Sequence, residues 1–93
     1  MSVSEEDILR VATSLATGKQ IKGANEIKSN YDYNSKEDIK SWGSGEYSLG
    51  GKSFKTKMDG SYKVKVTING KEFKGEIDGG KVKFDNGNSF YLS

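Results

Sequence analysis

The sequence predicts an α+β fold, in which an N-terminal helix packs across one face of a six-stranded antiparallel meander that is twisted enough to approach a half-barrel. Three observations predict it. An amphipathic, well-capped stretch lies near the N-terminus. From residue 46 onward, short runs of alternating apolar and polar residues are separated by glycine turns. A single sheet must bury its apolar face, and the helix offers the apolar stripe that this requires.

The chain has 93 residues, which suits one small domain. We therefore expect residues 1–93 to form a single unit, with a helical and loop part over 1–45 and the meander over 46–93.

The first helix is predicted over residues 5–17. Ser4-Glu5-Glu6-Asp7 matches a capping box, with acidic residues in the first turn, where the helix dipole favours them. Gly18 provides a C-terminal stop. The apolar residues that recur at helical spacing are Ile8, Leu9, Val11, Ala12, Leu15 and Ala16.

Residues 18–34 allow two interpretations. Ile21, Ala24 and Ile27 are three residues apart, which fits either a short helical turn or an extended crossing. Residues 30–34 read as a loop. A second capping box at residues 35–38 predicts a short helix over about 36–42.

Three two-residue turns predict the register of the meander. Asn69-Gly70 is a strong hairpin signal and sets Val66 opposite Phe73. Gly79-Gly80 sets Gly75 opposite Phe84, so that the aromatic ring covers the gap that glycine leaves. Gly50-Gly51 sets Tyr47 opposite Phe54.

Two further turns fit the apolar pattern only as three-residue loops. Asp59-Gly60-Ser61 is expected to set Met58 opposite Tyr62 and Thr56 opposite Val64. The loop around Gly87 is expected to set Phe84 opposite Phe90 and Val82 opposite Leu92. The predicted strands are 46–49, 52–58, 62–68, 71–77, 81–84 and 89–92.

These registers divide the side chains between two faces. Tyr62, Val64 and Val66 are expected to point inward. The predicted core is Ile8, Leu9, Ala12, Leu15, Phe54, Val64, Val66, Phe73, Ile77, Val82, Phe84, Phe90 and Leu92. The lysines expected on the outer face are Lys55, Lys57, Lys63, Lys65, Lys74, Lys81 and Lys83, accompanied by Glu46, Glu72, Glu76 and Tyr91.

The composition argues against an enzyme. The chain has no histidine and no cysteine, so it lacks the usual general base near neutral pH, the common metal ligands and the nucleophile arrangements built on them. Asn30, Asp32 and Asn34 alternate like the start of a calcium loop, but Ser35 replaces the required glycine. We expect no catalytic residues, no metal and no cofactor.

The sequence also argues against a membrane protein. No apolar run is long enough to span a bilayer, and the N-terminus has no signal-peptide core. The absence of cysteine fits a reducing compartment. We therefore expect a cytoplasmic protein without a membrane partner.

The first hypothesis of function is a small protein–protein interaction module, including an inhibitor that occupies a larger partner. By analogy of size and plainness alone, phage and mobile-element inhibitors of host defence, anti-CRISPR proteins among them, are of this kind. Tyr31, Tyr33 and Trp42 would be the anchors, since interface hot spots favour tyrosine and tryptophan.

The second hypothesis is a nucleic-acid-binding domain that uses the lysine-rich outer face, which would equally suit an acidic partner. Against nucleic acid stands the scarcity of arginine, since Arg10 is the single one in the chain, and a net charge of +2. The same lysines would also be explained by solubility, because charged side chains keep an exposed sheet face from aggregating.

Overall fold

The computed structural model describes residues 2–35 and 45–93 and confirms the α+β fold. Two helices accompany one antiparallel sheet, in which each strand pairs with the next along the chain. The elements are α1 (Glu5–Thr17), α2 (Ala24–Asn30), β1 (Tyr33–Ser35), β2 (Gly45–Leu49), β3 (Lys52–Met58), β4 (Lys63–Ile68), β5 (Lys71–Asp78), β6 (Lys81–Phe84) and β7 (Ser89–Tyr91).

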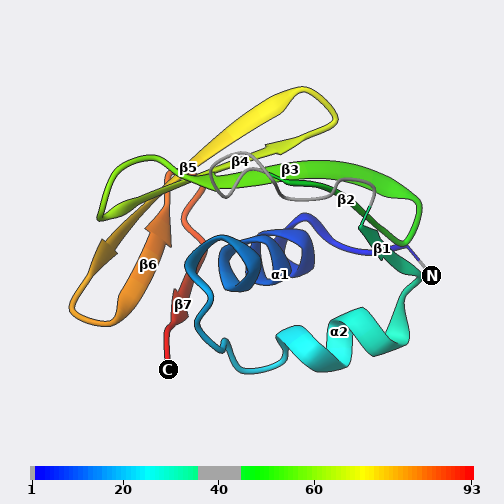
Figure 1. The fold of residues 1–93 in the computed structure, drawn as a ribbon, viewed down its shortest axis with the longest axis horizontal. Coiled ribbons are helices and arrows are strands. Elements are labelled where there is room, and N and C mark those ends of the chain that lie inside the picture. Colours follow the sequence, from blue (N-terminus) through cyan, green and yellow to red (C-terminus); the bar gives the residue numbers. More distant parts are fainter. Residues whose placement is uncertain (1, 36–44) are drawn as a thin grey trace.

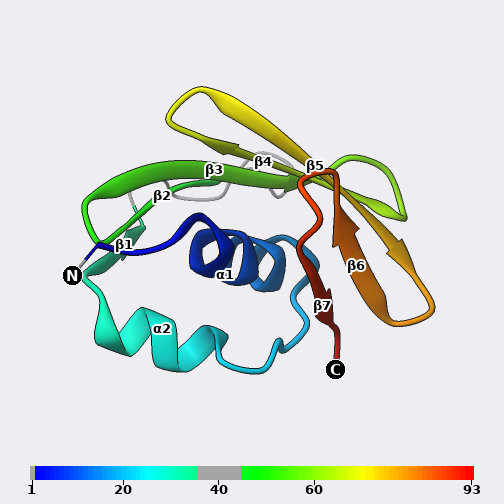
Figure 2. The same ribbon diagram turned by 180° about the vertical axis from the view of Figure 1, so that it is seen from behind.

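The sheet has seven strands where six were expected, and it does not close into a barrel. Its strands run in the order β1 to β7, so β1 and β7 are the two edges. The sheet bends around α1, which lies against its concave face, and α2 lies on the far side of α1 from the central strands (Figures 1 and 2). The convex face is left without a covering element among the described residues.

Helix α1 has the predicted bounds because both of its ends carry the expected caps. The Ser4 side chain accepts a hydrogen bond from the Asp7 backbone N–H at 3.1 Å, which satisfies one of the free N–H groups of the first turn. Gly18 adopts a left-handed conformation, with φ of 71°, and its N–H donates to the Ser14 carbonyl. The helix then buries its apolar stripe against the sheet.

The segment after α1 takes the helical alternative as α2. The predicted loop at residues 30–34 is wrong at both ends, because Asn30 ends α2 and residues 33–34 belong to a strand. Residues Tyr33–Ser35 form β1, which pairs with β2 so that Tyr33 lies opposite Leu49. The Gly50 N–H donates to the Asp32 carbonyl at 2.9 Å and extends this pairing. The sequence of this short, polar edge strand shows no alternating pattern, because its pairing with β2 and not its own residues makes it a strand. The predicted helix over 36–42 lies outside the described residues.

The three glycine turns give the predicted registers. Val66 lies opposite Phe73, Gly75 opposite Phe84, and Tyr47 opposite Phe54. Asn69 is the one non-glycine residue with a positive φ among the residues described, at 49°, as a tight Asn-Gly hairpin turn requires.

The two longer loops are each displaced from their predicted positions. The Asp59 N–H donates to the Lys63 carbonyl at 2.7 Å, so the loop is 60–62 and Met58 lies opposite Val64. Thr56 correspondingly lies opposite Val66, where Val64 was expected. Because a shift of two residues keeps every side chain on its face, the predicted faces are correct although the predicted cross-strand pairs are wrong. Tyr62 is the exception, since it leaves the strand and is 71% exposed where it was expected to point inward.

The last hairpin is shifted in the same way. The Phe84 N–H donates to the Asn88 carbonyl at 2.8 Å, and Val82 lies opposite Phe90 where Leu92 was expected. Phe84 is therefore not directly opposite Phe90, although their ring centroids are 6.3 Å apart in an edge-on contact. Gly87 does take the predicted left-handed conformation, with φ of 96°.

The core lies between α1 and the concave face of the sheet. Most of the predicted core is buried, while Leu15, Ile77 and Leu92 are half-buried at its border. The buried Thr56 hydroxyl donates to the Ala12 carbonyl at 3.0 Å and ties β3 to α1. Apolar residues that are buried beyond the predicted set are Val3, Val11, Ile21, Ala24, Tyr47, Leu49 and Ile68.

Candidate functional site

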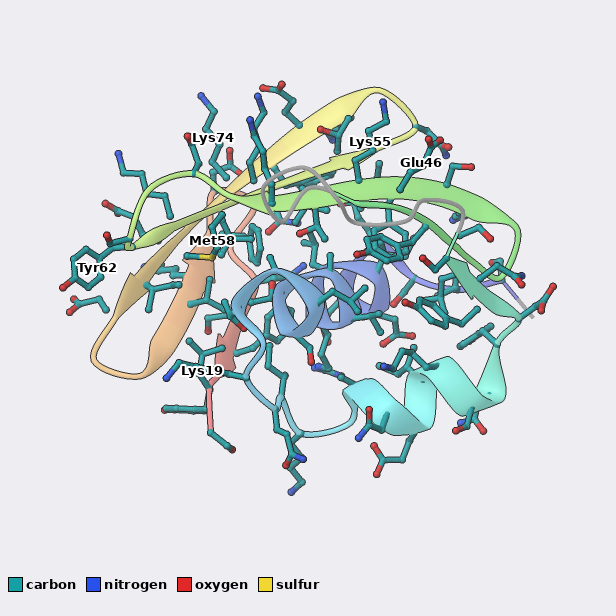
Figure 3. The ribbon with its side chains drawn as sticks, in the orientation of Figure 1. Lys19, Glu46, Lys55, Met58, Tyr62 and Lys74 are labelled. Carbon is teal, nitrogen blue, oxygen red and sulfur yellow. The ribbon has the colours of Figure 1, made fainter. Side chains whose placement is uncertain are left out.

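The convex face of the sheet carries the predicted lysines. Their strand neighbours Val64, Val66 and Phe73 are buried on the opposite face, so the alternation of each strand turns the lysines toward solvent. Figure 3 shows Lys55, Lys74 and Glu46 pointing away from α1. The lysines of this lysine face are Lys55, Lys57, Lys63, Lys65, Lys74, Lys81 and Lys83, of which Lys65 and Lys81 are half-buried and the others are exposed.

Three of these lysines form a row across the sheet. Lys57 on β3 lies directly opposite Lys65 on β4, and Lys65 lies directly opposite Lys74 on β5. Side chains that are directly opposite on one face have their Cβ atoms about 4.5–5.5 Å apart. Like charges at that separation destabilise a sheet, so the lysine row costs the fold stability that an alternation of charges would have avoided.

One carboxylate offsets part of this charge. Glu72 accepts from the Lys65 ammonium at 2.9 Å, one strand over and diagonally placed. This hydrogen bond holds the pKa of the Glu72 carboxyl below its usual value and raises the pKa of Lys65. Lys57 and Lys74, the two ends of the row, form no ion pair with another described residue.

Away from the row, lysines and carboxylates alternate. Lys63 lies opposite Glu76, and Glu76 lies opposite Lys83. Lys55 lies opposite Glu46. The lysine face is therefore a positive band with carboxylates on both sides, and not a uniformly basic surface.

Two hollows mark the lysine face. The larger, of about 480 Å³, is lined by Lys63, Lys74 and Lys83 together with Gly75, Glu76, Phe84 and Asp85. The smaller, of about 240 Å³, is lined by Lys55, Lys57 and Lys65 together with Thr56, Thr67 and Glu72. Lysine side chains thus stand around both hollows, where they could approach a carboxylate or phosphate group.

The tyrosines proposed as anchors lie elsewhere. Tyr33 is half-buried on the concave side at the β1 edge, where its ring stacks on Tyr47 with centroids 6.2 Å apart. Lys28 of α2 lies over the Tyr33 ring at 5.3 Å. Burial, and after it the neighbouring Tyr47, raises the pKa of the Tyr33 hydroxyl. Tyr31 is half-buried against the core as well, so both rings pack at the sheet edge.

The structure therefore does not bring the tyrosines and the lysines together. Tyr31 and Tyr33 border the concave side, whereas the lysine face is convex. Trp42, the third proposed anchor, lies outside the described residues.

Two other aromatic side chains are exposed. Tyr91, expected on the lysine face, is 75% exposed, and the Lys81 ammonium lies over its ring at 5.5 Å. Tyr62 borders a hollow of about 380 Å³ between the end of α1 and the sheet, with Met58, Ile77 and Leu92. The sequence pattern missed this exposure because it placed Tyr62 in β4.

Within the part of the chain that the structure describes, no group of three or more acidic side chains is placed to hold a metal ion. Neither α1 nor α2, the helices of the described ranges, has the length and apolarity needed to cross a membrane. A comparison of the chain with protein-family models, with curated proteins and with solved structures found no match.

Proposed function

We propose that the chain is a non-enzymatic protein-binding module, and that its lysine face binds an acidic surface of a larger protein. The observation that supports this most is the lysine row. A solvated sheet face needs charge for solubility, but it does not need three like charges directly opposite one another. Local features that reduce stability are expected where function requires them, and complementary charge is a common requirement of protein recognition.

The carboxylates favour a protein over a nucleic acid as the partner. Glu72 lies beside the lysine row and Glu76 lies between Lys63 and Lys83, so a continuous run of phosphates would meet negative charge on either side. A protein surface can place its own basic or polar groups opposite these carboxylates. The lysine face also lacks arginine, the residue best suited to paired contacts with phosphates and bases.

An inhibitor is the simplest form of this function. A rigid sheet that covers an acidic surface of an enzyme or a nucleic-acid-binding protein would block access to it without chemistry of its own. The inhibitors that phages and mobile elements direct against host defence, including anti-CRISPR proteins, remain the analogy, and it rests on size and composition.

The test is capture of partners from the source cell with the immobilised chain, with and without nuclease. We expect to capture a protein partner whether or not nuclease is added. Its affinity for the Lys57→Gln/Lys74→Gln variant should be lower by at least about tenfold. The matched control, Lys19→Gln/Lys28→Gln, removes the same charge from the helical side and should bind like the unmodified chain. Equal binding by both variants, or loss in the control alone, would contradict the use of the lysine face.

Nucleic acid is the second candidate, and the two lysine-lined hollows favour it. A single strand tracking across the sheet could place phosphates near both. Such binders usually add a platform of stacking aromatics. On the described lysine face, however, Tyr91 is the sole aromatic side chain, and Lys81 already covers its ring.

A further inference from the structure

The free edge of β7 has unpaired backbone groups. β6 occupies one side of β7, and the hydrogen bonds from Phe84 to Asn88 and from Leu92 to Gly80 show which residues face it. Because antiparallel strands alternate, Ser89 and Tyr91 direct their N–H and C=O groups to the other side. Ser93 follows the same alternation, and its N–H donates to the Gln20 carbonyl at 2.9 Å. Among the described residues, no backbone partner is recorded for Ser89 or Tyr91 on that side.

A groove runs along this edge. It has a volume of about 440 Å³ and is lined by residues of β7 and by residues 21–23, in the segment that joins α1 to α2. Phe90 and Ile21, both 5% exposed, form its apolar lining. The Arg10 guanidinium lies over the Phe90 ring at 4.9 Å and is held by Glu6 at 3.2 Å. The hydrogen bond between Ser93 and Gln20 connects the two walls.

The alternation of β7 defines what an added strand would meet. A residue paired with Phe90 would point into the groove, toward Phe90, Ile21 and the Arg10 guanidinium over the Phe90 ring. Because the lining of the groove is more apolar than polar, an apolar side chain suits this position. Residues paired with Ser89 and Tyr91 would point to the convex face. There Lys83, which is exposed, lies opposite Ser89, and Lys81 lies opposite Tyr91. Acidic side chains suit both outer positions.

The charges also argue against a second copy of this chain as the occupant. The groove lining contains two cations, Lys22 and Arg10, of which Arg10 is paired with Glu6 and Asp7, and Lys81 lies nearby on β6. Two β7 edges placed side by side would bring these cations together, which disfavours self-pairing.

We propose that the free edge of β7 binds an extended segment of a partner protein as an eighth, antiparallel strand, with an acidic–apolar–acidic sequence opposite Tyr91, Phe90 and Ser89. Backbone hydrogen bonds to Ser89 and Tyr91 provide affinity, and the alternating side chains provide specificity. This surface goes beyond the lysine face of the proposed function. It shares only Lys81 and Lys83 with that face, so either proposal can fail without the other.

The test uses the whole chain labelled with ¹⁵N and the blocked peptide Glu-Val-Glu-Val-Glu as the probe. We expect the backbone amide signals of Ser89 and Tyr91 to shift on titration. At a peptide concentration of about ten times the measured Kd, hydrogen exchange of these two amides should slow by about tenfold, since exchange then occurs from the unbound fraction. The Phe90 amide, which already faces β6, should change little.

Two controls separate strand addition from attraction of charges. The same peptide with N-methylated alternate amides keeps its charge but cannot pair with the edge, and it should leave Ser89 and Tyr91 unprotected. Ser89→Pro removes one free-edge N–H at the first position of the strand, where proline is tolerated, and should weaken binding, whereas Ser89→Ala should not. If Ser89→Pro does not fold, the N-methylated peptide decides alone.

Three results would overturn the proposal. The first is no binding at millimolar peptide, and the second is equal protection by the N-methylated peptide. The third is a set of shifts confined to Lys57, Lys65 and Lys74, which would support the lysine face and exclude the edge.

Discussion

Gly75 lies in the middle of β5 because the Phe84 ring needs its space. A Cβ atom built at Gly75 would lie 2.9 Å from Phe84 Cε1 and 3.0 Å from Val82 Cγ2, both too close for carbon atoms. The Gly79-Gly80 turn creates this contact, since it pairs residue 75 with residue 84. A residue of poor strand propensity is therefore retained for packing.

We expect Gly75→Val to destabilise the protein by about 1–3 kcal/mol, although valine is the better strand former, because the ring and Val82 must move. The measurement is the free energy of unfolding in urea. Thr67→Val, on the convex face of the neighbouring strand, is the matched control and should change stability little. A gain in stability for Gly75→Val would show that the ring does not depend on this gap.

The stacked pair Tyr33 and Tyr47 predicts a loss of stability at alkaline pH. Burial raises the pKa of both hydroxyls above their ordinary value of 10.0. Above that value the unfolded chain releases protons that the folded chain retains, so the free energy of unfolding falls as pH rises through the folded pKa values. Below the ordinary tyrosine pKa of 10.0, the two hydroxyls are protonated in both states and their contribution to stability is fully present.

We expect Tyr47→Phe to reduce this alkaline loss. Urea unfolding between about pH 9 and pH 11 measures it, around the ordinary tyrosine pKa. The raised pKa of Lys65 acts in the same direction, so part of the alkaline loss should remain in the Tyr47→Phe variant. An unchanged slope for Tyr47→Phe would mean that Tyr47 ionises equally in both states.

At the scale of elements, the sequence predicts the register of two strands correctly where the turn between them can adopt only one geometry. The Asn69-Gly70 turn requires two residues of positive φ, and this requirement fixes the pairs that follow it. The loops after Met58 and Phe84 carry a glycine in a longer polar stretch, so two registers keep the same faces, and the pattern could not choose between them.

The candidate site was predictable to the same extent. The alternation of single strands placed the lysines on the convex face, but the lysine row depends on the register between strands. The predicted register sets Lys57 opposite Lys63, and the displaced loop at residues 60–62 moves it opposite Lys65. The β7 edge was not anticipated, because its groove is formed by residues 21–23, whose path depends on tertiary packing.

The lysine row makes a prediction about the sheet itself. Replacing Lys57 by Gln removes a like-charge pair with Lys65 and should raise the thermal midpoint by about 1–3 °C at low salt. Added salt should shrink the gain, because it screens the repulsion. Lys55→Gln is the control, since Lys55 lies opposite Glu46, and its replacement should not stabilise. An equal rise in the thermal midpoint for both variants would indicate that the lower total charge, and not the loss of repulsion within the lysine row, stabilises the protein.

At the scale of the molecule, the helices and the sheet leave three separate surfaces. The convex face carries the lysines, the β7 edge offers backbone groups, and beside the β1 edge Tyr31 and Tyr33 pack against the core. One helix suffices to cover the concave face because the sheet bends around it. On the opposite, convex face, no element of the described residues covers the sheet.

The last prediction concerns that open face and nucleic acid. If it bound a phosphate backbone, each neutralised phosphate would release counterions, and log affinity would fall with log salt at a slope of about −0.7 to −0.9 per contact. Four contacts would give a slope of about −3. We expect no such salt-dependent binding, because Glu72 and Glu76 interrupt the positive charge of the lysine face and the whole chain carries a net charge of only +2.

Fluorescence anisotropy with labelled single-stranded and double-stranded oligonucleotides measures this. At physiological salt, binding should not exceed the non-specific level of about 10⁻⁴ M. Replacing Lys63, Lys65 and Lys83 by Gln should leave that level nearly unchanged. Submicromolar binding that falls steeply with salt and is abolished by these three substitutions would make nucleic acid the partner of the lysine face, since no weak and non-specific attraction depends so strongly on three side chains.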